Sequence, residues 1–186
     1  MTSRQPPGSP LIVDACCWID FFATGRINEI VAALPYRLAV LRYVVEEEVL
    51  TTISVRGVEE RCDFAELQAR ALVSVWDVET GAEKQELVRF AAHLDDGEAS
   101  VCALAVVRGG AMATDDRKAI SILGQLAPGV PIVQTPELLH TWAVRAPAAG
   151  DRLLEVLQAV QSRARFTPRR DVPFSDWWRR CLGADE

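Results

Sequence analysis

The sequence has no long uninterrupted apolar run, no apolar leader and no cysteine spacing typical of a structural site. Charged residues break its apolar stretches well before the roughly 20 residues that span a bilayer. The opening segment MTSRQPPGSP lacks the apolar core of a secretory signal peptide, so we expect a cytoplasmic protein without a membrane segment. The five cysteines form an odd-numbered set without CxxC spacing, which predicts buried free thiols and neither a disulfide framework nor a zinc site.

The chain is also poor in residues that nucleophilic mechanisms use. Its two histidines, His93 and His140, have no evident Ser or Cys partner, and we expect them to pack or to lie at the surface. Its only lysines are Lys84 and Lys118, and no Asp-x-Asp pattern follows the first predicted strand. These absences disfavour a phosphatase or receiver-like α/β domain that is phosphorylated on Asp14.

Negative charge predominates except near the end of the chain. The net charge of -6 argues against a protein that coats nucleic acid with its whole surface. Between residues 163 and 180, six arginines outnumber two aspartates, a local excess of four positive charges that leaves -10 on the rest. This asymmetry is explained either by a basic contact face or by the solvated side of a terminal helix.

Strand and helix patterns alternate along the 186 residues, which is typical of an α/β protein with a mostly parallel central sheet and helices on both faces. We expect strands at 11–17, 72–78, 111–114 and 130–134. The segment 38–41 is too short to assign. We expect helices at 18–25, 27–34, 42–54, 64–72, 82–93, 97–108, 117–126, 136–146 and 151–166, with an amphipathic segment at 171–182.

The predicted organisation is one α/β domain with short additions at both ends. Proline, glycine and serine predict an irregular leader over residues 1–10. Residues 11–145 form the α/β domain in this interpretation. Residues 146–186 form a helical extension that packs on the same domain.

Acidic residues stand beside three of the apolar runs. Asp14 closes LIVD, Glu98 lies in DDGEAS, and Asp115 and Asp116 follow GGAMAT. In a parallel sheet, ligands bind at the carboxyl ends of the strands, where Asp14 and Asp115 fall. Carboxylates at such positions are costly to desolvate without a positive partner, so their convergence predicts a divalent-metal site.

Each carboxylate also has a structural explanation. Asp14 and Asp116 are suited to cap the helices that follow them. Glu98 lies on the apolar stripe of its helix, and Asp95 with Glu98 has the spacing of a capping box.

The run Glu46-Glu47-Glu48 requires a choice of helical phase. At 100° per residue, Glu47 points away from the apolar side that Leu50 and Ile53 share with the neighbouring valines. Glu46 and Glu48 lie at the borders of that side, and periodicity alone does not choose between them.

Taken together, these segments resemble a PIN domain over roughly residues 10 to 140. LIVDACCWIDFFATGRI is similar to the family's first strand and aspartate, VVEEEV to its glutamate helix, DDGEASVCALA to its D-x-GE-A motif and MATDDRKA to its paired aspartates. Ala15 and Cys16 follow Asp14 where the family usually has a Ser or Thr. The resemblance implies a three-layer α/β/α PIN-like fold. It implies the catalytic and metal-binding set Asp14, Glu48, Glu98 and Asp115, with Asp116 as a further metal ligand.

The resemblance also implies an activity and partners. PIN proteins are Mg²⁺- or Mn²⁺-dependent nucleases, most often endoribonucleases, and many small bacterial members are VapC-like toxins with a cognate antitoxin and a homodimeric state. One or two cations would activate a water and offset charge on the scissile phosphate. A catalytically silent PIN-like binding module is the alternative. The candidates for contact with RNA, or with an antitoxin or second subunit, are Arg163, Arg165, Arg169 and Arg170.

Overall fold

The computed structural model describes residues 8–48, 50–54, 56–146 and 149–183, and the chain folds into two compact units. The first comprises Met1–Cys17, Pro35–Val49 and Asp63–Val133. The second comprises Trp18–Leu34, Leu50–Cys62 and Gln134–Glu186. Helix α1 (Ala15–Ala23) begins in the first unit and ends in the second.

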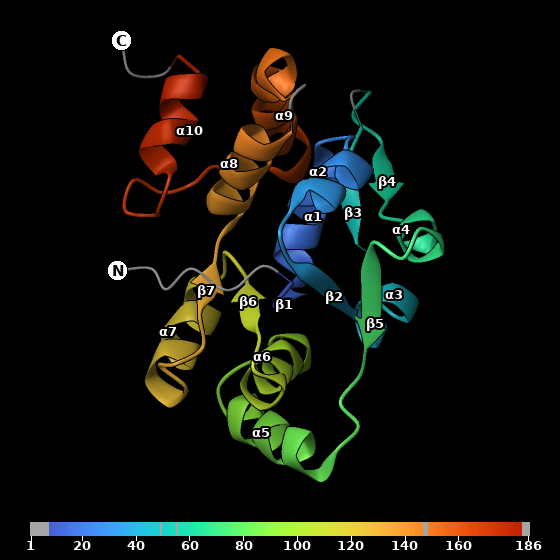
Figure 1. The fold of residues 1–186 in the computed structure, drawn as a ribbon, viewed down its shortest axis with the longest axis vertical. Helices are drawn as coiled ribbons and strands as arrows, with labels where there is room; N and C mark the ends of the chain where they lie inside the picture. Colours follow the sequence, from blue (N-terminus) through green and yellow to red (C-terminus); the bar gives the residue numbers. More distant parts are fainter. Residues whose placement is uncertain (1–7, 49, 55, 147–148, 184–186) are drawn as a thin grey trace. The chain divides into compact units, whose positions relative to one another are not determined.

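A five-stranded parallel sheet forms the centre of the first unit (Figure 1), which confirms the predicted α/β class. Its spatial order is β5-β2-β1-β6-β7, and every neighbouring pair is parallel. The strands are β1 (Pro10–Val13), β2 (Arg37–Leu41), β5 (Val73–Trp76), β6 (Ala111–Ala113) and β7 (Ile132–Val133). The short segment at 38–41 therefore belongs to strand β2. Side chains of β1 and β6 are almost wholly buried, as expected for strands with both faces covered.

The helices of the first unit lie in the connections between these strands. They are α3 (Arg42–Glu46), α4 (Ala65–Ala69), α5 (Gly81–Ala91), α6 (Asp96–Arg108) and α7 (Arg117–Leu126). From β2 to β5 the chain moves toward one edge of the sheet, and from β5 through β6 to β7 it moves toward the other. Right-handed crossovers therefore place α4 on one face and α6 and α7 on the opposite face, as a three-layer α/β/α fold requires. The reversal lies between β1 and β6, and such a switch point is where α/β sheets bind ligands.

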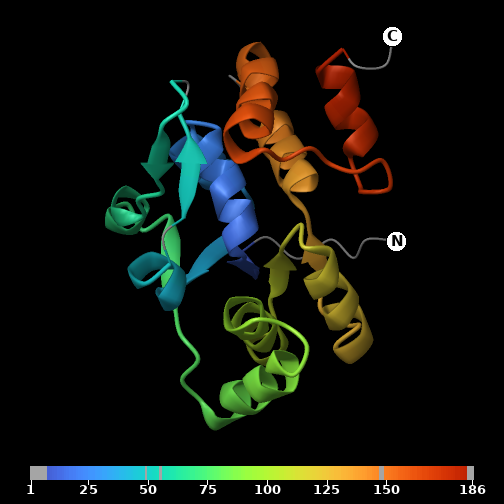
Figure 2. The same cartoon turned by 180° about the vertical axis from the view of Figure 1, so that it is seen from behind.

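Helices α5 and α6 pack side by side, as Figures 1 and 2 show, and an ion pair joins them. Glu83 forms a capping box with Thr80 at the start of α5, and its Oε1 accepts a 2.7 Å hydrogen bond from Arg108 Nε near the end of α6. Arg108 also donates to the carbonyl of Asp77 and stacks over Trp76 at 4.5 Å. These contacts fix α6, whose first turn carries Glu98.

The ion pair predicts a pH-dependent contribution to stability. The hydrogen bond from Arg108 lowers the pKa of Glu83 from 4.5 to about 2. A lowered pKa stabilises the folded protein above the unfolded value of 4.5, and this contribution disappears as the pH falls toward 2. Glu83→Gln should therefore lower the free energy of unfolding at pH 7 by about 1–2 kcal/mol, a value reduced for the partial exposure of Arg108. Urea unfolding at pH 7 and pH 3 should show a smaller difference at pH 3, and an equal difference at both would contradict the assignment.

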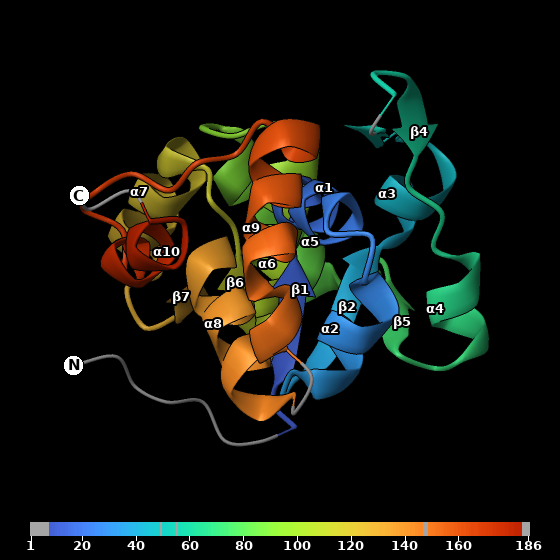
Figure 3. The same ribbon diagram turned by 90° about the horizontal axis from the view of Figure 1, so that it is seen from above.

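The second unit contains the remaining helices and a two-stranded antiparallel ribbon, labelled in part in Figure 3. Its helix α8 contacts both α2 and α10. The elements are α2 (Ile27–Ala33), β3 (Thr51–Ile53), β4 (Glu59–Arg61), α8 (Thr135–Arg145), a 3₁₀ turn (Gly150–Arg152), α9 (Leu153–Ala159), a π-helical turn (Val160–Ala164) and α10 (Ser175–Cys181).

Two sequence-based assignments differ from the structure. The predicted helix at 42–54 is wrong beyond Glu46, because Thr51–Ile53 form strand β3. Three β-branched residues in succession fit a strand better than a helix, and β4 provides their partner. The predicted strand at 11–17 ends at Val13 because α1 begins at Ala15.

The predicted leader lies mostly outside the described residues, which begin at Gly8. Gly8 donates its amide to the carbonyl of Pro35, and the amide of Arg37 donates to the carbonyl of Ser9. Strand β1 thus begins at Pro10, one residue before the predicted boundary. The division at residue 145 between a nuclease domain and a helical extension stays a prediction. Within the described residues, no helix combines the length and the apolar character needed to cross a bilayer.

Candidate metal centre

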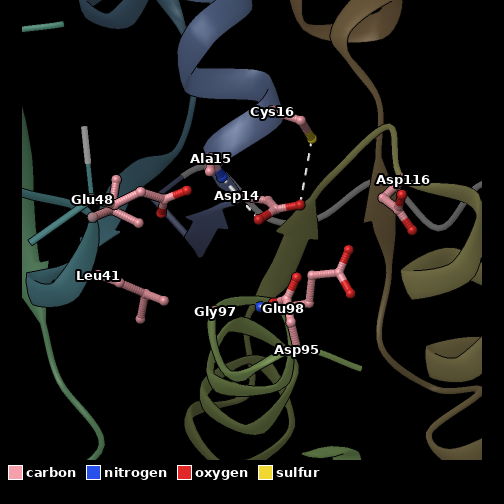
Figure 4. A pocket seen from close by; sticks show the side chains of 10 residues that line it. Asp14, Ala15, Cys16, Leu41, Glu48, Asp95, Gly97, Glu98 and Asp116 are labelled. Carbon is pink, nitrogen blue, oxygen red and sulfur yellow. Dashed lines mark hydrogen bonds between the residues drawn. The ribbon is translucent and has the colours of Figure 1, made fainter. Parts of the chain in front are cut away.

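A pocket of about 190 Å³ opens at the carboxyl ends of strands in the first unit (Figure 4). Its carboxylates come from the end of β1, the residues after α3, the start of α6 and the start of α7. The volume is ample for a hydrated cation, since a single water needs only about 10–15 Å³ by the same kind of measure. The lining residues are Asp14, Ala15, Cys16, Leu41, Val44, Glu48, Asp95, Gly97, Glu98 and Asp116.

Asp14 is the most buried of these carboxylates, and hydrogen bonds fix its orientation. Its Oδ1 accepts the amide of Ala15 at 2.8 Å, and its Oδ2 accepts the hydroxyl of Thr114 at 2.8 Å and the thiol of Cys16 at 3.4 Å. Burial raises the pKa of Asp14, and nearby Asp95 raises it further, while the three hydrogen bonds lower it. The side chain therefore carries its charge in a site that disfavours the charge unless a cation is near.

Thr114 is a partner of Asp14 that the sequence analysis does not predict. The PIN resemblance places a hydroxyl just after Asp14, where Ala15 and Cys16 stand, whereas the hydroxyl that donates to Asp14 comes from Thr114 at the end of β6. Val13 pairs with Ala113 in the parallel ladder, so the next residues, Asp14 and Thr114, leave the sheet side by side. The sequence feature that indicates this contact is that a polar residue directly follows each of the two apolar strands, Asp14 after β1 and Thr114 after β6.

Glu48 is the member of the acidic run that lines the pocket. Glu46 is exposed and pairs with Arg42 at 2.9 Å, and Glu47 is exposed, as its helical phase predicted. Glu48 follows the end of α3 and donates its amide to the carbonyl of Tyr43 at 2.9 Å. Burial raises the pKa of its carboxyl, and the charges of Asp14 and Asp95 add to the effect.

These positions predict unequal effects of two neighbouring substitutions. Glu48→Gln should weaken Mn²⁺ binding about tenfold or more, because it removes a charge from the pocket, whereas Glu47→Gln should leave it unchanged. Isothermal titration of Mn²⁺ into the two variants would compare them directly. An equal or reversed ranking would show that Glu48 is not a member of the site.

The first turn of α6 contributes two carboxylates. Asp95 caps the helix by accepting the amide of Glu98 at 2.8 Å, as predicted, but it also lines the pocket. Burial raises the pKa of Glu98, and so do the charges of Asp95, Asp116 and Asp14, while a main-chain hydrogen bond from Asp95 lowers it. Asp95 therefore both caps α6 and lines the pocket, and its spacing from Glu98 in the sequence predicted only the cap.

The structure places the two paired aspartates differently, and only Asp116 of the two expected ligands lies at the pocket. Asp116 lines the pocket and also caps α7 by accepting the amide of Ala119 at 2.8 Å. Asp115 is not among the lining residues, and its Oδ2 accepts the thiol of Cys17 at 3.4 Å. Consecutive side chains leave an extended segment on opposite sides, so one of the pair turns away. The structure thus places Asp116, rather than Asp115, with Asp14, Glu48 and Glu98.

The pocket concentrates negative charge without a protein cation to balance it. Five of its ten lining residues are carboxylates, and none of the ten, all in the described part of the chain, is Lys, Arg or His. Carboxylate oxygens are the donors that Mg²⁺ and Mn²⁺ prefer, so the donor set fits a hard divalent cation. No family model, curated protein or solved structure matches the chain. The function is therefore inferred from the geometry of the pocket.

Arg163, one of the predicted RNA contacts, is engaged within the second unit. Its guanidinium donates to the carbonyls of Ile53 and Ala23 at 2.9 and 2.8 Å and pairs with Glu60 at 2.9 Å, and only 17% of its side chain is exposed. These bonds join three segments far apart in sequence. Arg163 is thus placed as a structural anchor.

The other three arginines are exposed. Arg169 pairs with Asp171, while Arg165 and Arg170 remain candidates for an external phosphate or carboxylate. Contact of these arginines with RNA or a partner protein stays a prediction.

The largely buried position of Arg163 and the exposed position of Arg165 predict different effects of their removal on the free energy of unfolding. Arg163→Ala should lower the free energy of unfolding by about 2–4 kcal/mol, because it leaves two carbonyls and one carboxylate without their donor. The exposed control Arg165→Ala should change it by less than about 0.5 kcal/mol. Chemical denaturation would measure both, and similar values would remove the anchoring role of Arg163.

Aromatic side chains pack against one another in the second unit. Trp178 is fully buried and contacts Phe166 edge to face at 5.9 Å. His140 stacks against Phe174 at 4.5 Å and contacts Trp177 at 5.0 Å. These contacts confirm the expected packing of His140.

Proposed function

We propose that the protein is a divalent-cation-dependent endoribonuclease that hydrolyses RNA phosphodiester bonds with Mg²⁺ or Mn²⁺. The observation that supports this most strongly is that five carboxylates, from four separate places in the chain, converge on one pocket. No Lys, Arg or His is among the residues that line it. Burial, and after it the charge of neighbouring carboxylates, raises the pKa of Asp14, Glu48 and Glu98, and carboxyls with such shifted pKa values cluster at functional sites. The PIN resemblance of the sequence supplies the substrate class.

In this proposal Asp14 is the central ligand, and its neighbours hold it in place. The Ala15 amide and the Thr114 hydroxyl each bind one carboxylate oxygen, so the group is oriented before a cation arrives. Oδ1 accepts only the Ala15 amide, so it keeps a lone pair that can bind a cation, whereas Oδ2 accepts both Thr114 and Cys16. Glu48, Glu98 and Asp116 approach from other elements.

A bound divalent cation would activate a water for attack on the phosphate and would offset the charge that develops on the leaving 3′-oxygen. Leu41 and Val44 form an apolar side of the pocket, which lowers the local dielectric and strengthens the electrostatic interactions of the carboxylates. No histidine or cysteine nucleophile is needed for this chemistry.

The direct test is cleavage of a defined RNA by the purified full chain. With Mn²⁺ the RNA should be cut into products with 5′-phosphate and 3′-hydroxyl ends, because water, not the 2′-hydroxyl, is the nucleophile. Excess EDTA should stop the reaction, and renewed Mn²⁺ should restore it. Products with 2′,3′-cyclic phosphate ends, or cleavage that persists in EDTA, would reject the proposed chemistry.

The proposal also includes the role of the protein in the cell. The sequence resemblance supports a cytoplasmic toxin of a toxin-antitoxin pair, with a homodimeric state and a small antitoxin as partner. Expression of the chain alone should arrest growth, and co-expression of a small protein encoded beside it should relieve the arrest. Growth that is unaffected by the cleavage-competent chain would remove the toxin role but leave the nuclease proposal intact.

A further inference from the structure

Two thiols and a carboxylate meet beside the acidic pocket, and the proposed nuclease chemistry leaves them unused. Cys16 and Cys17 lie in the first turn of α1, and Asp115 follows β6. One ligand atom from each of these residues lies within 4.8 Å of the other two. All three belong to the first unit.

Two of the three distances between these atoms are close to those of ligands on one tetrahedral ion. Zinc–sulfur bonds of about 2.3 Å and zinc–oxygen bonds of about 2.0 Å put two sulfurs about 3.8 Å apart and a sulfur and an oxygen about 3.5 Å apart. In the structure, the sulfurs of Cys16 and Cys17 are 4.0 Å apart, and Cys17 Sγ lies 3.4 Å from Asp115 Oδ2. The third distance, between Cys16 Sγ and the Asp115 carboxylate, is at most 4.8 Å, so the three ligands can close on an ion through side-chain adjustment.

The residues around Cys16 also favour its thiolate as a metal ligand. The amide of Asp115 donates to Cys16 Sγ at 3.4 Å, a bond of the kind that orients and stabilises metal-bound thiolates. Cys17 is fully buried, whereas Cys16 is partly exposed and lines the acidic pocket. The pocket thus reaches the cluster at Cys16.

We propose that Cys16, Cys17 and Asp115 form a second cation site, which takes a borderline-soft divalent ion such as Zn²⁺. Two sulfurs and one oxygen suit zinc and its analogues Co²⁺ and Cd²⁺, and they disfavour Mg²⁺, which prefers oxygen alone. Binding converts both thiols to thiolates and releases their two protons to solvent. A water completes the four ligands.

The test uses Co²⁺ as a spectroscopic probe of the reduced full chain. On addition of Co²⁺ the parent should develop a thiolate-to-metal charge-transfer band in the near ultraviolet, and Zn²⁺ should remove it. Cys16→Ala should weaken the affinity by more than about 100-fold, beyond the 10- to 100-fold loss typical of an outer-sphere residue, and Asp115→Asn should weaken it at least about tenfold. Cys16 is partly exposed, so its replacement leaves the core intact, unlike replacement of Cys17.

Two controls separate this site from other thiols and from the acidic pocket. Cys181→Ala removes another partly exposed cysteine and should leave the band unchanged. The double variant Glu48→Gln/Glu98→Gln weakens the acidic pocket and should also keep the band. A parent without the band, a band that survives Cys16→Ala, or a band lost in the double variant would overturn the proposal. None of these readouts requires RNA, so they remain decisive whether or not the chain is a nuclease.

Discussion

Asp14→Asn is expected to reduce Mn²⁺-dependent RNA cleavage by about a thousandfold or more, because it removes the charge of the most buried carboxylate in the pocket. The substitution keeps the size of the side chain. The Thr114 hydroxyl can rotate to accept a hydrogen bond from the new amide, while the remaining carbonyl oxygen accepts the amide of Ala15. Cleavage of a labelled RNA by parent and variant at equal concentration provides the measurement.

The same variant should be at least as stable as the parent in the absence of metal. Burial, and then the charge of Asp95, raises the pKa of Asp14 in the folded protein. A group with a raised pKa binds its proton more tightly when folded, so ionisation destabilises the parent as the pH rises from the ordinary pKa of 3.8 through the folded pKa. In EDTA at pH 7, the melting temperature of Asp14→Asn should therefore equal or exceed that of the parent. A large loss of stability would mean that the activity loss reflects unfolding.

Asp116→Asn should reduce cleavage by about a hundredfold or more, and Asp115→Asn should have a clearly smaller effect. Asp116 lines the pocket, whereas Asp115 accepts a hydrogen bond from Cys17. Asparagine caps helices about as well as aspartate, so Asp116→Asn removes the charge but preserves the cap on Ala119. Side-by-side cleavage rates for the two variants test the placement. A dominant effect of Asp115→Asn would restore the role that the sequence resemblance gave to that residue.

The fold class could be predicted from the sequence because the strong patterns were local. Apolar strands, capped helices and the glycine that ends α1 all depend on neighbouring residues, and the strands at 73–76 and 111–113 and the helix at 117–126 formed where they were expected. The segment 42–54 was misassigned because its strand forms only by pairing with β4, a contact that helical periodicity does not record.

The candidate site was predictable in its location but not in its full membership. The PIN resemblance implied Asp14, Glu48 and Glu98, and all three line the pocket. The choice between Asp115 and Asp116 depended on which side chain turns toward the pocket after β6, a direction that adjacent sequence positions do not reveal. Thr114 reaches Asp14 only through the pairing of β1 with β6.

Calorimetric titration of Mn²⁺ into the metal-free full chain tests the central claim most directly. At pH 7 the parent should bind Mn²⁺ at the acidic pocket, and Asp14→Asn should weaken that binding by at least about tenfold with an unchanged circular dichroism spectrum. Cys181→Ala serves as a control that changes a side chain outside the pocket. A parent that does not bind Mn²⁺, or a folded Asp14→Asn variant that binds it as tightly as the parent does, would contradict the assignment of the pocket as a metal centre.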